Sequence, residues 1–173
     1  MSSQSRLALP ALLLATAMAV VVGTALGFEH IGGYIPCKLC LEQRVPYYAG
    51  VPIALLAALA AAFKSPPAVS RGLLAVAGLA MAYALYLGVY HSGVEWSWWA
   101  GPADCGAGGA GAATTTGNLL DQLNKIHIVS CTDAPFRFPD AAWGLSFAGL
   151  NAVASTVLAL AALFGIARDS GRI

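Results

Sequence analysis

The sequence predicts an all-α membrane protein, an antiparallel bundle of four transmembrane helices in a single domain of 173 residues. Only 10% of its residues are charged, whereas soluble domains carry about 25%, and the mean hydropathy is +0.72. Four runs of 22, 19, 23 and 27 residues contain no Asp, Glu, Lys or Arg: residues 7–28, 45–63, 72–94 and 141–167. A bilayer core needs roughly 20 helical residues, so each run can span it. The net charge of +1 gives no reason to expect nucleic acid as a partner.

The first run has two interpretations. Arg6, an apolar stretch and the small residues near Ala25 are also features of a cleaved signal peptide. The apolar core of a signal peptide covers about 7–15 residues, whereas this run covers 22. We therefore expect a retained helix, and cleavage would leave the remaining topology unchanged.

The distribution of basic residues predicts the orientation of the bundle. With four spans, both termini and the 64–71 connection share one side, and their short segments carry Arg6, Lys64, Arg71, Arg168 and Arg172. Seven of the eight acidic residues fall in the opposite loops, residues 29–44 and 95–140. Lys and Arg are enriched in short cytoplasmic loops. The termini are therefore expected in the cytoplasm, and the loops with all four cysteines outside it, where disulfides persist.

The second outer loop is long and divided. It opens with Trp96, Trp98 and Trp99, which suit an aromatic belt at the membrane surface or a contact site for a partner. Residues 118–129 have helical periodicity, with apolar residues on one face. This short helix would lie in the membrane interface or cap the ends of the bundle. Within the fourth run, Asn151 is expected to form an interhelical hydrogen bond.

Cys37 and Cys40 are separated by two residues directly after the first apolar run. This spacing allows a small, labile disulfide and often lowers the pKa of one thiol. If the segment is helical, Arg44 lies one turn after Cys40 on the same face. Its guanidinium would then stabilise a Cys40 thiolate, although an interfacial arginine with a snorkelling side chain is an alternative.

Cys105 and Cys131 lie 26 residues apart in the second outer loop. Four cysteines allow three pairings, which the sequence leaves open. A static structural disulfide is one interpretation of this pair. A tetrahedral zinc site is another, although zinc motifs usually show two close cysteine pairs.

The order of these features resembles the bacterial disulfide bond formation protein B family (DsbB), quinone reductases of the inner membrane. The resemblance is carried by residues 36–44, Pro-Cys-Lys-Leu-Cys-Leu-Glu-Gln-Arg, and by Cys105 and Cys131 between the third and fourth runs. The related vitamin K epoxide reductase-like proteins place their loop cysteines before the CxxC, so the order here favours the DsbB family. Lys38 departs from the neutral residue expected there and would alter the redox poise.

The resemblance implies a relay of four catalytic cysteines. A periplasmic DsbA-like protein with a thioredoxin fold would be oxidised at Cys105, leaving Cys105 and Cys131 reduced. Cys131 would then attack Cys37, and Cys40 would pass electrons to ubiquinone or menaquinone. The resemblance thus implies a quinone-dependent protein-disulfide oxidoreductase, with membrane lipid, quinone and the DsbA-like protein as partners.

Two residues are expected to bind the quinone. Arg44 would stabilise negative charge beside it, and His91, at the end of the third run, would contact it or handle its protons. An interfacial histidine without that role is the alternative for His91. The alternative for the whole chain is a non-catalytic membrane protein with structural disulfides or a zinc site formed by its four cysteines.

Overall fold

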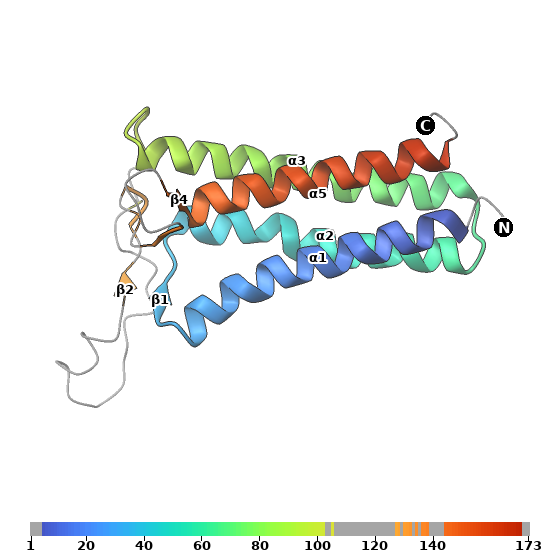
Figure 1. The fold of residues 1–173 in the computed structure, drawn as a ribbon, viewed down its shortest axis with the longest axis horizontal. Coiled ribbons are helices and arrows are strands. Elements are labelled where there is room, and N and C mark those ends of the chain that lie inside the picture. Colours follow the sequence, from blue (N-terminus) through green and yellow to red (C-terminus); the bar gives the residue numbers. More distant parts are fainter. Residues whose placement is uncertain are drawn as a thin grey trace.

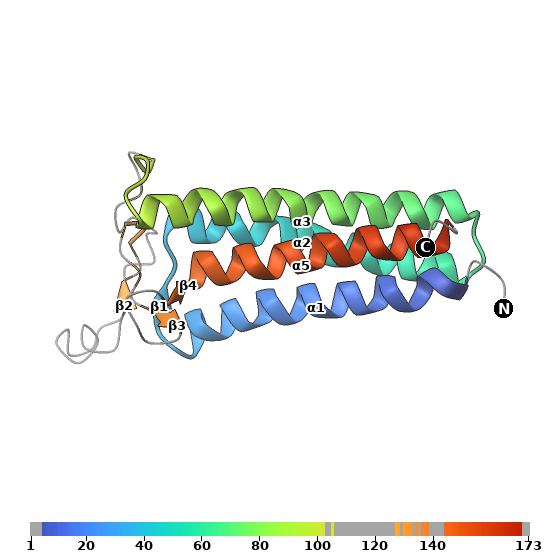
Figure 2. The same ribbon diagram turned by 45° about the horizontal axis from the view of Figure 1, so that its top comes forward.

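A computed structural model describes residues 5–102, 105, 127–128, 130–132, 134, 136–138 and 144–170 (Figure 1). This part of the chain contains four long helices, α1 (Ser5–His30), α2 (Lys38–Ala62), α3 (Pro67–Glu95) and α5 (Phe147–Asp169). They run antiparallel, so that the α2–α3 turn lies at one end of the bundle and the four short strands lie at the other (Figures 1 and 2). Each helix is long and apolar enough to cross a membrane. The predicted four-helix membrane bundle is confirmed.

Two helices begin at other residues than expected. α2 begins at Lys38 instead of residue 45, because Cys37 caps it: the Cys40 amide donates to the Cys37 sulfur over 3.2 Å. The first outer loop therefore covers residues 31–37 and not 29–44. α5 begins at Phe147 instead of residue 141, with Ser146 as its N-cap. Runs without charge locate the hydrocarbon-spanning part of a helix, whereas side-chain caps determine where the helix starts.

The β1–β2 pairing connects the two outer loops, whereas the β3–β4 pairing lies within the second loop. β1 (Tyr34–Ile35) pairs in parallel with β2 (His127–Ile128), and β3 (Arg137–Phe138) pairs antiparallel with β4 (Leu145–Ser146). The expected helix over residues 118–129 is wrong at His127–Ile128, where pairing with β1 requires an extended backbone; the rest of that expectation falls outside the described residues. Gly33, with φ 70°, provides the left-handed turn that leads from α1 into β1.

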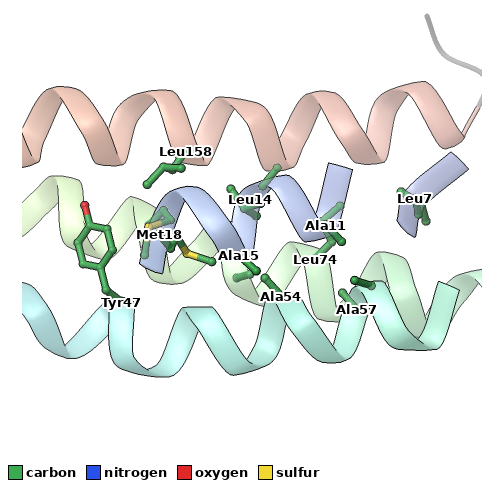
Figure 3. Close-up of a cluster of buried hydrophobic side chains, with 14 of the residues drawn as sticks. Leu7, Ala11, Leu14, Ala15, Met18, Tyr47, Ala54, Ala57, Leu74 and Leu158 are labelled. Carbon is green, nitrogen blue, oxygen red and sulfur yellow. The ribbon is translucent and has the colours of Figure 1, made fainter. Parts of the chain in front are cut away.

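Small side chains fill the bundle axis away from the strands. Inward-facing positions recur every three or four residues and bury mostly alanines, with a few leucines and methionines, some of which Figure 3 labels: Leu7, Ala11, Leu14, Ala15, Met18, Ala54, Ala57, Ala58, Ala61, Leu74, Ala77, Met81 and Ala84. Small residues let membrane helices approach closely. At Gly88 a Cβ atom would lie only 3.0 Å from the backbone nitrogen of Ala152, so α3 and α5 touch there. The result is a tightly packed frame beneath the loops.

Candidate active site

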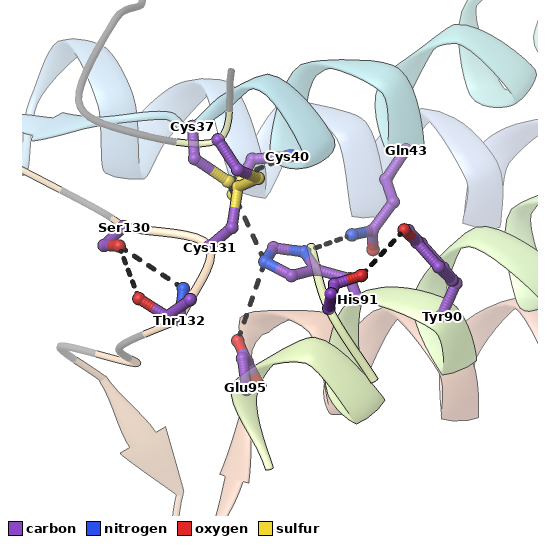
Figure 4. Close-up of a disulfide and its surroundings, with 11 residues drawn as sticks. Cys37, Cys40, Gln43, Tyr90, His91, Glu95, Ser130, Cys131 and Thr132 are labelled. Atoms are coloured by element: carbon purple, nitrogen blue, oxygen red, sulfur yellow. Dashed lines mark hydrogen bonds and ion pairs between the residues drawn. A yellow bond between two sulfur atoms is a disulfide. The ribbon is translucent and has the colours of Figure 1, made fainter. Parts of the chain in front are cut away.

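The two cysteine pairs meet at the strand end of the bundle (Figure 4). Cys37, the N-cap of α2, and Cys40, in its first turn, have sulfur atoms 2.7 Å apart and are free thiols. Cys105 and Cys131 form a disulfide with Cα atoms 5.7 Å apart. The Cys131 sulfur lies within 4.8 Å of the Cys37 sulfur. Cysteines from two separate loops thus form one continuous chain of sulfur atoms.

This cluster is shielded from solvent. The exposed fraction is 2% for Cys37, 7% for Cys105 and 0% for Cys131, and Leu39 and Val94 pack against them. Cys37, Cys131 and His91 have potential ligand atoms within 4.8 Å of one another. Zinc binds the thiolate form of cysteine, a form that Cys131 does not have while its sulfur is part of a disulfide. The short distance between the Cys37 and Cys131 sulfurs is also what exchange between a thiolate and a disulfide requires.

Electrostatics favour a thiolate at Cys37. The Cys40 thiol donates a hydrogen bond to the Cys37 sulfur, which holds the pKa of Cys37 below that of an ordinary thiol. Burial opposes this effect, whereas His91, with Nε2 3.8 Å from the sulfur, adds to it. The helix N-terminus also favours negative charge at this position.

His91 lies in the last turns of α3, and its ring is buried between three partners (Figure 4). Its Nδ1 is 2.6 Å from the side-chain nitrogen of Gln43 on α2. Its Nε2 lies 3.8 Å from the Cys37 sulfur and 3.9 Å from a carboxylate oxygen of Glu95. The other Glu95 oxygen accepts a hydrogen bond from Ser146. His91 therefore faces the thiols and is buried within the protein.

A chain of hydrogen bonds continues from His91 into the bundle. Asn151 on α5 donates to the side-chain oxygen of Gln43 over 2.6 Å and to the Ala84 carbonyl over 3.3 Å. The Tyr47 hydroxyl donates to the Asn151 side-chain oxygen over 2.7 Å. The expected interhelical hydrogen bond of Asn151 is confirmed, and it links α5 to both α2 and α3.

A partly open cavity of about 450 Å³ lies beside Cys40, lined mainly by residues of α1, α2 and α5. Its outer wall consists of aromatic rings with centroids 4.7–5.8 Å apart: Phe28, Tyr34, Phe136 and Phe147. Cys40 is the one cysteine among the described residues that lines it. Arg44 and His91 also line it, so the cavity brings together the three side chains that the sequence assigned to quinone chemistry.

Arg44 is held by α1. Its guanidinium forms an ion pair with Glu29 and donates to the Ala25 carbonyl over 3.3 Å. The side chains of Arg44 and Glu29 are 12% and 26% exposed, and both line the cavity. The positive charge expected to face Cys40 is therefore shared with a carboxylate that the sequence interpretation had not considered.

The family model of the disulfide bond formation protein DsbB matches residues 7–165. The chain belongs to the DsbB family. No curated protein and no solved structure matches it significantly. Membership in the DsbB family, together with four apolar helices, makes the protein a multi-pass, disulfide-forming membrane oxidoreductase from a family that uses quinones.

Four site residues of this DsbB-family protein were not predicted from the sequence: Glu29, which pairs with Arg44, and Gln43, Tyr47 and Glu95. Gln43 and Tyr47 lie on the buried stripe of α2, four and eight positions after Leu39. A polar side chain on an inward stripe of a membrane helix is a usable signal, but the stripe appears only once α2 is known to begin at Lys38. Glu95 belongs to the last turn of α3, whereas the charge-free run ends one residue before it.

The tryptophans after α3 face outward. Trp96, Trp98 and Trp99 are 51%, 69% and 40% exposed. Trp99 stacks on Tyr90 with ring centroids 6.1 Å apart, and the Arg137 guanidinium lies 5.9 Å from the Trp96 ring. This exposure suits an aromatic belt and also a surface for a partner of a DsbB-family protein.

Proposed function

We propose that this protein reoxidises a periplasmic DsbA-like dithiol oxidase and transfers the electrons through its two cysteine pairs to a membrane quinone. The observation that supports this proposal most strongly is the contiguity of the site. The Cys131 sulfur adjoins Cys37, Cys37 adjoins Cys40, and Cys40 lines an apolar cavity.

The first stage is an exchange at Cys105. A thiolate of the partner attacks the Cys105 sulfur, the Cys105–Cys131 bond breaks, and Cys131 leaves as a thiolate. The second partner thiol, after losing its proton, attacks the mixed disulfide. The partner departs oxidised, and Cys105 and Cys131 hold the two electrons.

The second stage transfers these electrons to the CxxC. The Cys131 thiolate attacks Cys37 in a Cys37–Cys40 disulfide, and Cys40 leaves as a thiolate on the cavity wall. Cys105 then attacks Cys131, which restores the Cys105–Cys131 disulfide and releases Cys37 as a thiolate. His91, with Nε2 facing the Cys37 sulfur, favours negative charge there and makes Cys37 a good leaving group.

The cavity fits a quinone. Its aromatic rings suit a flat ring system, and Arg44 and His91 would supply polar contacts to the oxygens. A bound quinone supplies an acceptor for two electrons and two protons. Cys37 and Cys40 re-form their disulfide as they release the electrons, so that one partner disulfide and one quinol form in each turnover. Ubiquinone and menaquinone both meet these requirements.

The proposal includes an inner-membrane location with cytoplasmic termini. The end of the bundle that holds the α2–α3 turn carries Lys64, Arg71 and Arg168, and short basic segments stay in the cytoplasm. The cysteine end then faces the periplasm, where a DsbA-like partner is found.

Turnover of the purified protein tests the proposal. With a reduced DsbA-like dithiol and a short-chain ubiquinone analogue, we expect quinone reduction that is lost in Cys37→Ser and in Cys40→Ser. Cys105→Ser should lose activity with the protein partner but retain it with a small dithiol that reduces Cys37–Cys40 directly. Unchanged turnover in either CxxC variant would contradict the relay.

Alkylation and metal analysis test the non-catalytic alternative. Redox-dependent alkylation at both pairs, measured by mass with and without quinone, supports the relay. Permanently protected cysteines would favour structural disulfides, and stoichiometric zinc would favour a metal site.

A further inference from the structure

We propose that Gln43 and Asn151 are positioning residues that fix His91 as the neutral tautomer with its proton on Nε2. In this form His91 donates a hydrogen bond to the Cys37 sulfur and does not act as its base. The catalytic meaning of this arrangement rests on the proposed function, whereas the tautomer itself does not.

Asn151 determines the donor-to-acceptor direction of the hydrogen bonds that run through Gln43 to His91. A backbone carbonyl can only accept a hydrogen bond, so the Asn151 atom that contacts the Ala84 carbonyl must be its amide nitrogen. The Asn151 oxygen then faces Tyr47, whose hydroxyl donates to it. The Ala84 carbonyl thus determines which way this amide points, and the Tyr47 hydroxyl, which can donate or accept, donates in this arrangement.

Gln43 transmits that direction. The Asn151 nitrogen also donates to Gln43, so the atom of Gln43 that faces Asn151 is its oxygen. The amide nitrogen of Gln43 is therefore the atom that faces His91 Nδ1, at 2.6 Å. An amide nitrogen can only donate, and Nδ1 must accept with a free lone pair.

The proton of a neutral His91 ring then lies on Nε2. This atom faces the Cys37 sulfur at 3.8 Å and Glu95 at 3.9 Å. A base for the Cys37 thiol would need an unprotonated Nε2, and hence a proton on Nδ1 pointing at the Gln43 amide hydrogens. A doubly protonated ring would have the same conflict, and reversing the amides would lose the Asn151–Ala84 hydrogen bond.

Charged groups of both signs surround the ring. Glu95, on the same helix, has a carboxylate oxygen 3.9 Å from Nε2, and the positive charge of Arg137 from β3 acts on that carboxylate. Cys37 from α2 faces the ring as a thiolate and gains from the Nε2 hydrogen. Cys131, in the disulfide, adds no charge. The Gln43 amide determines which ring nitrogen of His91 carries the proton, because it contacts Nδ1 directly.

Nitrogen-15 NMR of the intact protein labelled at histidine measures the tautomer. The chain has three histidines, and the spectrum of His91→Asn identifies the His91 signals. At neutral pH we expect an unprotonated Nδ1 and a protonated Nε2 in the native protein. A proton on Nδ1, alone or together with Nε2, would overturn the proposal without any variant.

Two substitutions of Gln43 provide the matched comparison. In Gln43→Glu the carboxylate can only accept, so we expect an imidazolium with protons on both ring nitrogens; its charge and the retained Nε2 hydrogen bond should move the midpoint of Cys37 alkylation to lower pH. Gln43→Met removes the amide that donates to Nδ1, so we expect a mixture of His91 tautomers and a midpoint of Cys37 alkylation at higher pH. A purely structural role for Gln43 would move both profiles in the same direction.

The outcomes are separable from those of the proposed function. The NMR and alkylation measurements need neither quinone nor partner. The expected tautomer in a protein without quinone turnover would leave this inference standing and reject the relay. Normal turnover in a protein whose His91 carries its proton on Nδ1 would reject this inference and leave the relay standing.

Discussion

Replacing Arg44 by alanine should weaken the use of quinone and leave the exchange with the partner dithiol intact. The Arg44 side chain is 12% exposed on the wall of the cavity, so solvent screens its charge little. A hydrogen bond to a charged group contributes about 1.5–3 kcal/mol. We therefore expect the KM for a ubiquinone analogue to rise roughly 10- to 150-fold.

The ion pair with Glu29 requires a control, because Arg44→Ala leaves that carboxylate without the guanidinium that faces it. A lone carboxylate could itself raise the KM. The double variant Arg44→Ala, Glu29→Gln separates the two causes. If Arg44 binds quinone, the KM of the double variant stays high; if the lone carboxylate is responsible, it returns toward the native value.

Steady-state quinone reduction gives the KM, and a single-turnover reaction of reduced partner with the Cys105–Cys131 disulfide gives the exchange rate. Arg44 lines the cavity, whereas neither cysteine of that disulfide does, so the exchange rate should not change. An equal loss in both measurements, or an unchanged KM, would refute the role assigned to Arg44.

Three further predictions concern the thiol, the cavity and the frame. Because its pKa is lowered, Cys37 in the reduced protein should remain a thiolate at pH values below about 8.5, and its alkylation rate should fall only as the pH drops through that lowered pKa; a midpoint at or above the ordinary thiol value would contradict the site's electrostatics. Phe147→Ala removes a ring from the cavity wall and should raise the KM for quinone, whereas Phe164→Ala should not, because Phe164 on α5 is 59% exposed and does not line the cavity. Gly88→Ala forces a Cβ against the α5 backbone at 3.0 Å, whereas Gly72→Ala meets nothing within 4 Å; in a detergent unfolding titration Gly88→Ala should be about 1–3 kcal/mol less stable than Gly72→Ala, and equal stabilities would contradict the close contact of α3 and α5.

The helices were predictable because a membrane leaves a strong signal in the sequence. Spanning segments must satisfy their backbone internally and keep charges out of the hydrocarbon, so runs without charge located all four. Their outer ends were not predictable in this way. The start of α2 depends on the Cys37 cap, and the conformation of His127–Ile128 depends on pairing with β1, a contact between segments far apart in the chain.

The residues of the site were largely predictable from the sequence, whereas the contacts between them were less so. Cys37, Cys40 and Arg44 have helical spacing, and their common surface follows from it. The contact of Cys131 with Cys37 depends on how the second loop folds back, which local spacing does not encode. The Glu29–Arg44 ion pair joins α1 to α2, and only the packing of those helices places the two charges together.

The same packing explains why polar side chains gather at one level of an otherwise apolar bundle. A buried polar group is costly unless it is hydrogen-bonded, and Tyr47, Asn151, Gln43 and His91 each satisfy the next. Below them the stripe of α2 continues as Gly50 and alanines, which offer no partner. Polar character can therefore extend from the thiols only as far as each member finds a donor or acceptor on a neighbouring helix. Loss of any one member strands its neighbours, so residues remote from the sulfur atoms control the environment of Cys37.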